Sequence, residues 1–153
     1  MAKPYLIVVH GPNLNRLGVR KPDTYGRRTL PDVIAMVQTV ADAYGLDVRD
    51  VQSNHEGALI DFLQQHGPEA VGILINPGAF GHYSYALRDC LEDIDRPTVE
   101  VHISNVHKRE SFRHQLVLSD VVLGQVVGLG TDGYRYAAEA LCQRWQQQRS
   151  LTD

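Results

Sequence analysis

Short apolar runs alternate with amphipathic segments along the whole chain. The runs "GILIN" and "VVLGQVV" show little alternation of apolar and polar residues, which is typical of parallel strands buried on both faces. Between such runs, apolar residues recur at the spacing of a helix with one buried face. The pattern predicts strands at 5–9, 46–51, 71–76, 97–103 and 121–128, and helices at 30–44, 56–66, 84–94 and about 132–148.

Strand and helix segments in this order predict an α/β architecture. The fold class that we expect is a flavodoxin-like, doubly wound, five-stranded parallel sheet with helices on both faces. No repeat, linker or low-complexity stretch interrupts the 153 residues, a length that suits one buried core. We therefore predict a single catalytic domain over 1–153, with its core at about 5–146 and a flexible C-terminal tail.

Local signals also predict where helices begin and end. Thr29 precedes Leu-Pro-Asp, and Ser53 is followed by Glu56 three residues later, which has the form of a capping box. Gly45 marks the end of the first long helix, because glycine is common just after a helix.

Composition narrows the possible partners and location. The formal net charge of −3 gives no electrostatic reason to expect nucleic acid. The apolar run at 5–9 is too short for the core of a signal peptide, and no run approaches the roughly 20 apolar residues of a membrane span. Cys90 and Cys142 lie far apart without a Cys-x-x-Cys motif, so we expect small buried side chains. These observations favour a cytoplasmic protein that binds neither nucleic acid nor membrane.

Candidate chemistry gathers in the loops that follow the predicted strands. In open α/β sheets, ligands bind outside the carboxyl ends of the strands. Four of the five loops there are rich in Asn, His, Arg, Ser or Glu, whereas the opposite connections "AYGLD" and "IDRP" have the composition of plain turns. We therefore place the functional site at the carboxyl edge of the sheet.

The loop after the first strand contains a tyrosine among basic residues. It lacks the glycine spacing of a phosphate-binding loop, and Pro12 removes one backbone N–H donor. Arg20 precedes Tyr25 by five residues. A guanidinium at about 4 Å favours a phenolate by up to about 4 kcal/mol before desolvation opposes it. Tyr25 is therefore a candidate base, and a packed ring with a tethered hydroxyl is the alternative.

The fourth predicted strand ends in a carboxylate and an imidazole. Period-two alternation in "VEVHI" places Glu100 and His102 on the same side of this strand. A carboxylate orients an imidazole and increases its basicity, which makes His102 a candidate general acid. The alternative is a histidine hydrogen-bonded at a strand end. Glu100 and His102 with His107 and Glu110 match no named zinc spacing, so we expect no metal.

Four longer motifs carry a resemblance to a known family. The segments "GPNLNRLGVRKPDTYG", "QSNHEGALID", "INPGAFGHYSYALRD" and "VEVHISNVHKRESFRH" occur in this order, within a match from residue 5 to about 141. They closely resemble the type II 3-dehydroquinate dehydratases of the shikimate and quinate pathways. The resemblance implies a cofactor-free homododecamer, built as a tetramer of trimers. It also implies trans elimination of water from 3-dehydroquinate, through an enolate, to 3-dehydroshikimate.

The resemblance implies a catalytic role for five residues. Tyr25 corresponds to the tyrosinate that removes the proton from C2 of the substrate, and Arg20 to the arginine that keeps it ionised. Asn13 corresponds to the residue that orients a water onto the enolate oxygen. His102, supported by Glu100, corresponds to the acid that protonates the departing C1 hydroxyl.

The resemblance also implies a set of substrate-binding residues. Asn76 and the backbone N–H groups of Ile103 and Ser104 correspond to the pocket for the substrate carboxylate. His82 and Arg113 correspond to the residues that contact ring hydroxyls. Arg109 corresponds to a second arginine of the loop over the site, and Asp89 to an aspartate from a neighbouring subunit. Arg16, Gly81 and Tyr83 depart from the usual pattern of the family, which affects the expected loop dynamics more than the reaction.

Three other functions remain as alternatives. A flavin-binding electron carrier of the same fold would need a Ser/Thr-rich phosphate loop, which "HGPNLN" does not provide. A dehydratase that forms a Schiff base would need an activated lysine, but the only lysines are Lys3, Lys21 and Lys108, at the terminus or in loops. A purely structural assembly protein would leave the clustered His, Arg and Tyr unexplained.

Overall fold

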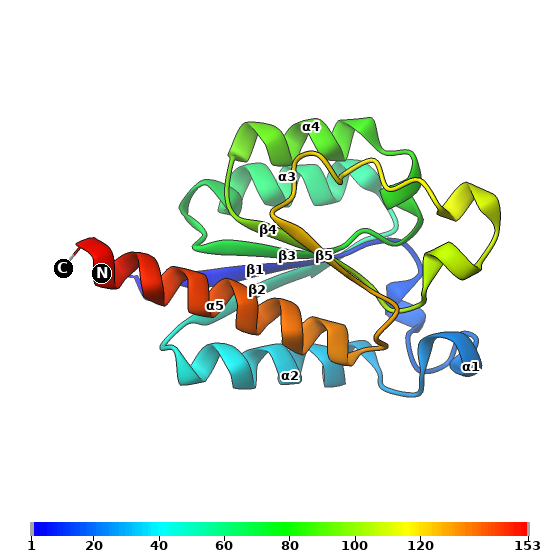
Figure 1. Ribbon diagram of the computed structural model, residues 1–153, viewed down its shortest axis with the longest axis horizontal. Helices are drawn as coiled ribbons and strands as arrows, with labels where there is room; N and C mark the ends of the chain where they lie inside the picture. Colours follow the sequence, from blue (N-terminus) through cyan, green and yellow to red (C-terminus); the bar gives the residue numbers. More distant parts are fainter. Residues whose placement is uncertain (1, 153) are drawn as a thin grey trace.

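A computed structural model describes residues 2–152 of the chain. It contains one five-stranded, all-parallel sheet with the order β2-β1-β3-β4-β5 (Figure 1). This is the flavodoxin-like order, so the predicted fold class is confirmed. The strands are β1 (Tyr5–His10), β2 (Asp47–Gln52), β3 (Gly72–Asn76), β4 (Thr98–His102) and β5 (Gly124–Val127).

Helices cover both faces of the sheet. Figure 1 shows α3 and α4 on one face and α2 and α5 on the other. The helices are α1 (Pro22–Tyr25), α2 (Leu30–Ala43), α3 (Glu56–His66), α4 (Tyr85–Ile94) and α5 (Asp132–Thr152). Helix α5 continues to Thr152 instead of ending near residue 148 as predicted. Within residues 2–152, none of these helices has both the length and the apolar character that crossing a bilayer requires.

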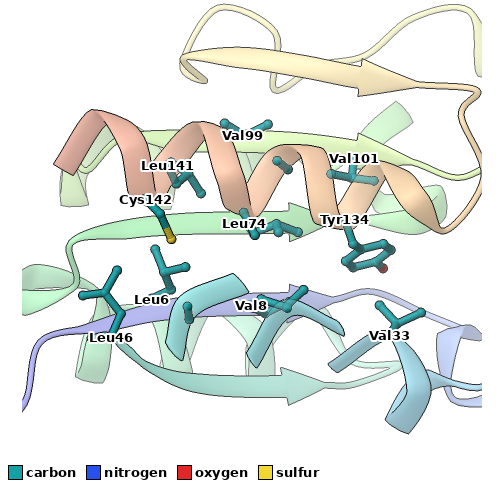
Figure 2. Packing of buried hydrophobic residues seen from close by; sticks show 14 of the residues in the cluster. Leu6, Val8, Val33, Leu46, Leu74, Val99, Val101, Tyr134, Leu141 and Cys142 are labelled. Atoms are coloured by element: carbon teal, nitrogen blue, oxygen red, sulfur yellow. The ribbon is translucent and has the colours of Figure 1, made fainter. Parts of the chain in front are cut away.

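The two faces of the sheet belong to two separate hydrophobic cores. Leu6 and Val8 of β1 point toward α2 and α5, where Tyr134 and Cys142 also pack (Figure 2). Ile7 and the other odd-numbered residues of β1 point toward α3 and α4. Full burial of a side chain of this size contributes about 1.5–3 kcal/mol, so both layers hold the sheet firmly.

The same alternation continues into the polar ends of the strands. His10 lies beside Asn76 in the sheet register, and both follow the face that carries Leu6 and Val8. Glu100 lies beside Ile75, on the face of α3 and α4. Because side chains alternate along a strand, His102 shares the face of Glu100. The polar side chains at the carboxyl edge are therefore divided between the two faces of the sheet.

The predicted helix start at Thr29 is confirmed. The hydroxyl of Thr29 accepts a hydrogen bond from the backbone N–H of Asp32, and the Asp32 carboxylate accepts one from the backbone N–H of Thr29. The predicted end is also confirmed, because Gly45 has a φ of 73° just after α2. The N–H of Leu46 then donates to the carbonyl of Ala41 at 3.0 Å, which closes the helix with a Schellman-type bond.

The predicted capping box at Ser53 is wrong. The N-cap of α3 is His55, and its side chain makes no capping hydrogen bond. Ser53 instead closes a small turn, because its hydroxyl accepts a hydrogen bond from the N–H of His55 at 2.9 Å. The carboxylate of Glu56 is used across the fold, where it accepts a hydrogen bond from the hydroxyl of Ser84.

The loops after β1 and β3 touch where the chain leaves the sheet. A Cβ atom at Gly11 would lie 2.0 Å from the carbonyl oxygen of Pro77, so only glycine fits there. The N–H of Gly11 donates to the carbonyl of Asn76 at 2.8 Å, which ties the two loops together. This contact fixes the relative position of the two loops at the carboxyl edge of the sheet.

Candidate active site

A cavity of about 270 Å³ opens at the carboxyl edge of the sheet. It is lined by loops after β1, β3 and β4, as the sequence predicted for the site. Most of the predicted site residues line this cavity: Asn13, Arg20, Tyr25, Asn76, His82, His102, Ile103, Ser104, Arg109 and Arg113. Glu100 lies behind His102, and Asp89 lies elsewhere.

Two arginines surround Tyr25. Nη1 of Arg109 donates to the phenolic oxygen at 2.8 Å and to Oγ of Ser104 at 3.0 Å. The guanidinium carbon of Arg20 lies 4.8 Å from the centre of the tyrosine ring. The arginine that touches the hydroxyl is therefore Arg109, whereas Arg20 stacks on the ring. Both positive charges lie where they would stabilise a negative oxygen.

Strand β4 carries a buried carboxylate–imidazole pair, which a side chain of β5 contacts. Oε2 of Glu100 lies 2.5 Å from Nε2 of His102, and the two side chains are 0% and 5% exposed. Nε2 of Gln125 donates to the other oxygen of Glu100 at 2.8 Å, and also to Oγ of Ser119 at 2.9 Å. Because Glu100 occupies Nε2 of His102, Nδ1 is the nitrogen that can exchange a proton with a bound molecule.

A second histidine lies against this pair. Nδ1 of His82 lies 3.0 Å from the carbonyl oxygen of Gln115, to which it donates, and the rings of His82 and His102 are 6.0 Å apart. Burial lowers the pKa of His82 below its usual range, so its ring is neutral near pH 7. With Nδ1 as the donor, Nε2 of His82 can accept a hydrogen bond from a hydroxyl in the cavity.

Two arginines of the cavity are joined through one carboxylate. Nε of Arg113 donates to Glu110 at 2.9 Å, and Nε of Arg109 lies 3.8 Å from the same carboxyl group. The hydrogen bond from Arg113 holds the pKa of Glu110 below its usual range. Glu110 thus stays charged and keeps both guanidinium groups beside the cavity.

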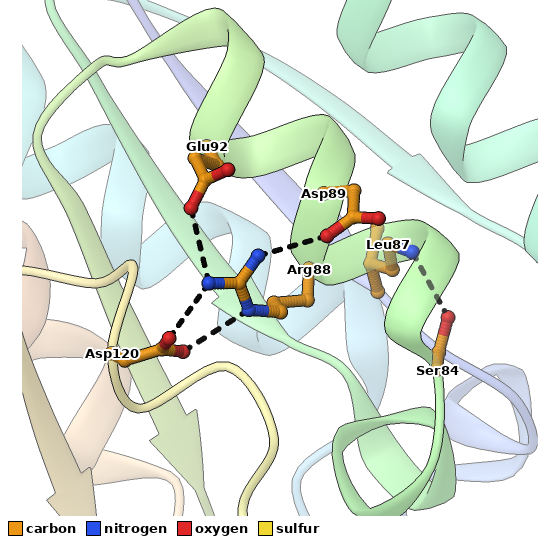
Figure 3. A network of polar contacts seen from close by, with 6 residues as sticks. All are labelled: Ser84, Leu87, Arg88, Asp89, Glu92 and Asp120. Carbon is orange, nitrogen blue, oxygen red and sulfur yellow. Dashed lines mark hydrogen bonds and ion pairs between the residues drawn. The ribbon is translucent and has the colours of Figure 1, made fainter.

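Asp89 lies on the exposed surface of α4, outside the cavity of its own chain. Figure 3 shows it with Arg88, Glu92 and Asp120, the four residues that we call the Arg88 network. Arg88 donates to Asp89 at 2.8 Å, to Glu92 at 3.0 Å and to Asp120 at 2.7 Å. A role of Asp89 in substrate binding would therefore have to be in the cavity of another subunit.

The side chains of the metal alternative do not converge. Among residues 2–152, no three His, Cys, Asp or Glu side chains form a group that could hold a metal ion. Glu100 and His102 bind each other, while His107 lies near His114 and Glu110 faces Arg113. The four side chains therefore belong to separate contacts in this structure.

Three polar residues of this region were missed in the sequence. Tyr134 contacts Asn76, Gln125 contacts Glu100, and His10 contacts Tyr134 in turn, whereas the sequence predicted only Asn76 and Glu100 of these residues. A signal existed for His10, which is a polar residue at the end of an apolar strand. Tyr134 and Gln125 carry no such signal, because only the folded chain brings them to Asn76 and Glu100.

The fold and the site together define a class of protein. A flavodoxin-like α/β sheet with Tyr, His, Arg and carboxylate groups around a small cavity is typical of an enzyme that acts on a small polar molecule. The model of the family described as dehydroquinase class II matches residues 4–142. The chain belongs to this family, which confirms the resemblance drawn from the four motifs.

Related proteins and structures agree with this assignment. The chain is 54% identical over 136 residues to the 3-dehydroquinate dehydratase of Roseiflexus castenholzii, covering 89% of this chain and 87% of that protein. It is 51% identical to that of Halothermothrix orenii, covering 88% and 90%. The type II dehydroquinase structure from Propionibacterium acnes superposes with a TM-score of 0.86 at 40% identity, covering 94% and 98%.

Proposed function

We propose that this chain is a type II 3-dehydroquinate dehydratase, a hydro-lyase that converts 3-dehydroquinate to 3-dehydroshikimate through an enolate. Membership of the dehydroquinase class II family and the named relatives support the activity. The observation that carries the proposal is the 2.8 Å hydrogen bond from Arg109 to the phenolic oxygen of Tyr25, inside the cavity that also contains His102. This hydrogen bond joins Tyr25, the candidate base, to the cation Arg109 in the same cavity as His102, the candidate acid.

Tyr25 is the proposed base. A guanidinium donor stabilises negative charge on the oxygen that it contacts, as Arg109 does here, and Arg20 adds a second positive charge over the tyrosine ring. The phenolate takes the proton from C2 of the substrate, which is acidic because the neighbouring carbonyl can accept the electron pair. In this proposal Arg109 takes the larger share of the stabilisation, since it touches the oxygen.

His102 is the proposed acid, and it approaches from the other face of the sheet. Tyr25 packs against the core of α2 and α5, whereas His102 follows the face of α3 and α4. A base and an acid on opposite sides suit a trans elimination, in which the proton and the hydroxyl leave from opposite faces of the ring. Glu100 orients the imidazole and stabilises its charged form.

The remaining predicted residues hold the substrate in this proposal. The side chain of Asn76 and the backbone N–H groups of Ile103 and Ser104 bind the carboxylate, which suits donors at the end of strands. His82 and Arg113 bind ring hydroxyls, and Nε2 of a neutral His82 is the acceptor. Asn13, at the rim of the cavity, orients a water onto the enolate oxygen, where charge develops.

A flavin-binding electron carrier is not favoured. The relatives that match most of this chain are named as dehydratases, and the loop after β1 lacks a phosphate-binding sequence. We propose that the reaction requires neither cofactor nor metal. A cytoplasmic location also remains a proposal, supported by the free thiols of Cys90 and Cys142, since disulfides are rare in reducing compartments.

The activity is tested by adding 3-dehydroquinate to the purified protein and following the absorbance of the conjugated enone product. We expect turnover that survives prolonged chelation and dialysis. Borohydride trapping with substrate serves as the control for a Schiff-base mechanism, and no covalent adduct is expected. A protein that folds but shows no enone formation would contradict the proposed function, and activity restored only by a divalent ion would contradict the metal-free mechanism.

We also propose a homododecamer, built as a tetramer of trimers, in which Asp89 reaches the cavity of a neighbouring subunit. The 71% exposure of the Asp89 side chain and its position outside its own cavity support this role. In a closed symmetric assembly, each subunit can contribute the same residue to its neighbour. Mixing Tyr25→Phe and Asp89→Ala subunits should then restore some activity, because some sites receive both intact residues. A mixed oligomer no more active than the separate variants would remove Asp89 from the site.

A further inference from the structure

Three buried polar side chains form a chain of hydrogen bonds behind the cavity. His10, Asn76 and Tyr134 are 0%, 3% and 0% exposed. Nδ2 of Asn76 donates to the hydroxyl oxygen of Tyr134 at 2.9 Å, and that oxygen lies 3.3 Å from Nδ1 of His10. Figure 2 shows Tyr134 between α5 and the sheet, among side chains that are otherwise apolar. Only Asn76 of the three lines the cavity.

Each hydrogen bond among His10, Asn76 and Tyr134 has a fixed direction. The N–H of Gly78 donates to Oδ1 of Asn76 at 3.1 Å, which identifies the oxygen side of the amide. Nδ2 must therefore donate to Tyr134, and the hydroxyl of Tyr134 keeps its own proton to donate to His10. Burial lowers the pKa of His10 to about 4, so the ring is neutral at physiological pH and Nδ1 can accept this proton.

The opposite arrangement would leave more polar groups unpaired. If Nδ1 of His10 carried the proton, the oxygen of Tyr134 would receive two donors and its own proton would have no acceptor. Within residues 2–152, Nε2 of His10 is the buried side-chain nitrogen or oxygen that has no hydrogen-bond partner. Such orphaned groups are costly, so their presence calls for an explanation beyond packing. With Nδ1 of His10 as the acceptor, Nε2 of His10 is the one polar atom of the three side chains that has no partner.

We propose that His10 and Tyr134 are positioning residues that fix the orientation of the Asn76 amide at the cavity. An amide nitrogen carries two hydrogens, and Tyr134 accepts only one of them. The second stays available to a bound carboxylate, and the inference rests on the proposed function in this respect. A phenylalanine and an apolar residue would fill the same space without burying three polar groups, so the polar chain serves orientation.

The first test removes the hydroxyl and keeps the ring. In Tyr134→Phe, the amide of Asn76 loses its acceptor and can rotate, so we expect KM for 3-dehydroquinate to rise about tenfold while kcat changes by less than about threefold. The matched control is Tyr44→Phe, which removes a hydroxyl that donates to Glu139 at 3.0 Å in the same helical layer. This control should leave KM and kcat unchanged.

A double-mutant cycle shows whether the effect passes through Asn76. Asn76→Ala alone should raise KM at least as much as Tyr134→Phe, and adding Tyr134→Phe to Asn76→Ala should change KM by less than about twofold. For His10, the leucine variant removes the acceptor, whereas His10→Gln offers one to the Tyr134 hydroxyl. We expect His10→Leu to raise KM and His10→Gln to restore most of it, even if the two variants have equal thermal stability.

A structural measurement makes the test independent of turnover. Crystal structures of the wild type and Tyr134→Phe should show the plane of the Asn76 amide rotated in the variant. A protein inactive toward 3-dehydroquinate would contradict the proposed function, and the amide rotation would still decide the inference. An unrotated amide, or KM within twofold of the wild type in both Tyr134→Phe and His10→Leu, would overturn it.

Discussion

The Glu100–His102 pair and the Arg88 network use similar partners in opposite surroundings. Glu100 is fully buried and lies 2.5 Å from His102. Arg88 binds three carboxylates on the surface of α4, and the side chains of Asp89, Glu92 and Asp120 are 71%, 61% and 65% exposed. Water and salt weaken contacts of the second kind but scarcely reach the first. Burial, more than the number of ion pairs, therefore determines how far water and salt weaken a charged contact.

Burial also indicates why each contact exists. A buried carboxylate loses its hydration, so a pair such as Glu100 with His102 is weak evidence for stability. Its fixed geometry instead suits proton transfer, because the imidazole is held in one orientation. The Arg88 network holds Arg88 in place but leaves its carboxylates in water, where they remain available to another molecule.

The largest expected effect comes from Tyr25→Phe. It removes the proposed base from the cavity and should lower kcat about a thousandfold, within the 10²–10⁴-fold range of general acid–base catalysis, with KM little changed. The control is Tyr85→Phe, a 65% exposed tyrosine on α4, which should turn over normally. Steady-state kinetics with 3-dehydroquinate measure both variants. Activity above about a tenth of the wild type in Tyr25→Phe would exclude this residue as the base.

The next effect comes from neutralising the buried carboxylate. Glu100→Gln keeps the shape of the side chain but removes the charge that supports His102, so kcat should fall about a hundredfold. Its matched control is Glu92→Gln, the same change in the Arg88 network, which should leave kcat as it is. Equal activity in both variants would show that burial makes no difference to these contacts.

A smaller effect is expected on stability in acid. Burial lowers the pKa of His10 to about 4, whereas an unfolded histidine titrates near pH 6.5, so the unfolded chain takes up the proton first. The folded state therefore loses stability as the pH falls from 6.5 toward 4, by about 2 kcal/mol at pH 5 compared with pH 8. Denaturant unfolding at the two pH values measures this loss. His10→Gln should lose less, and the same loss in both proteins would contradict the assignment.

The smallest effect is expected in the Arg88 network. Arg88 holds the pKa of Asp120 below its usual range, yet the side chain of Asp120 is 65% exposed. Asp120→Asn should leave kcat unchanged and shift the midpoint of thermal unfolding only slightly, less at high salt than at low salt. A loss of stability comparable to that from replacing a buried core residue would show that the exposed network matters to the fold.

The sheet and most of the cavity could be predicted from the sequence, because both depend on short-range patterns. Short apolar runs identified the strands, and the rule for carboxyl ends located the loops and strand end that contain Tyr25 and His102. Contacts between residues that are far apart in the sequence were harder to predict. Arg20 is five residues from Tyr25 and drew attention, whereas Arg109, 84 residues away, makes the hydrogen bond to its hydroxyl.

Local signals failed where the fold offered a polar side chain a different partner. Ser53 was predicted to cap α3, but its hydroxyl binds the N–H of His55, and Glu56 is used by Ser84. Tyr134 is 58 residues from Asn76 and lies in a helix with an ordinary amphipathic pattern. Its role could not be predicted from the sequence, because the contact exists only once α5 packs on the sheet.

The division of the polar strand ends between two faces of the sheet has a consequence for how such a protein can change over generations. Asn76 rests on the layer of α2 and α5, and Glu100 on that of α3 and α4. Substitutions that repack one layer move one wall of the cavity and leave the other in place, since distant sites contribute independently. Selection can therefore adjust the contact that Asn76 makes on one side of the cavity while the Glu100–His102 pair on the other side is inherited intact.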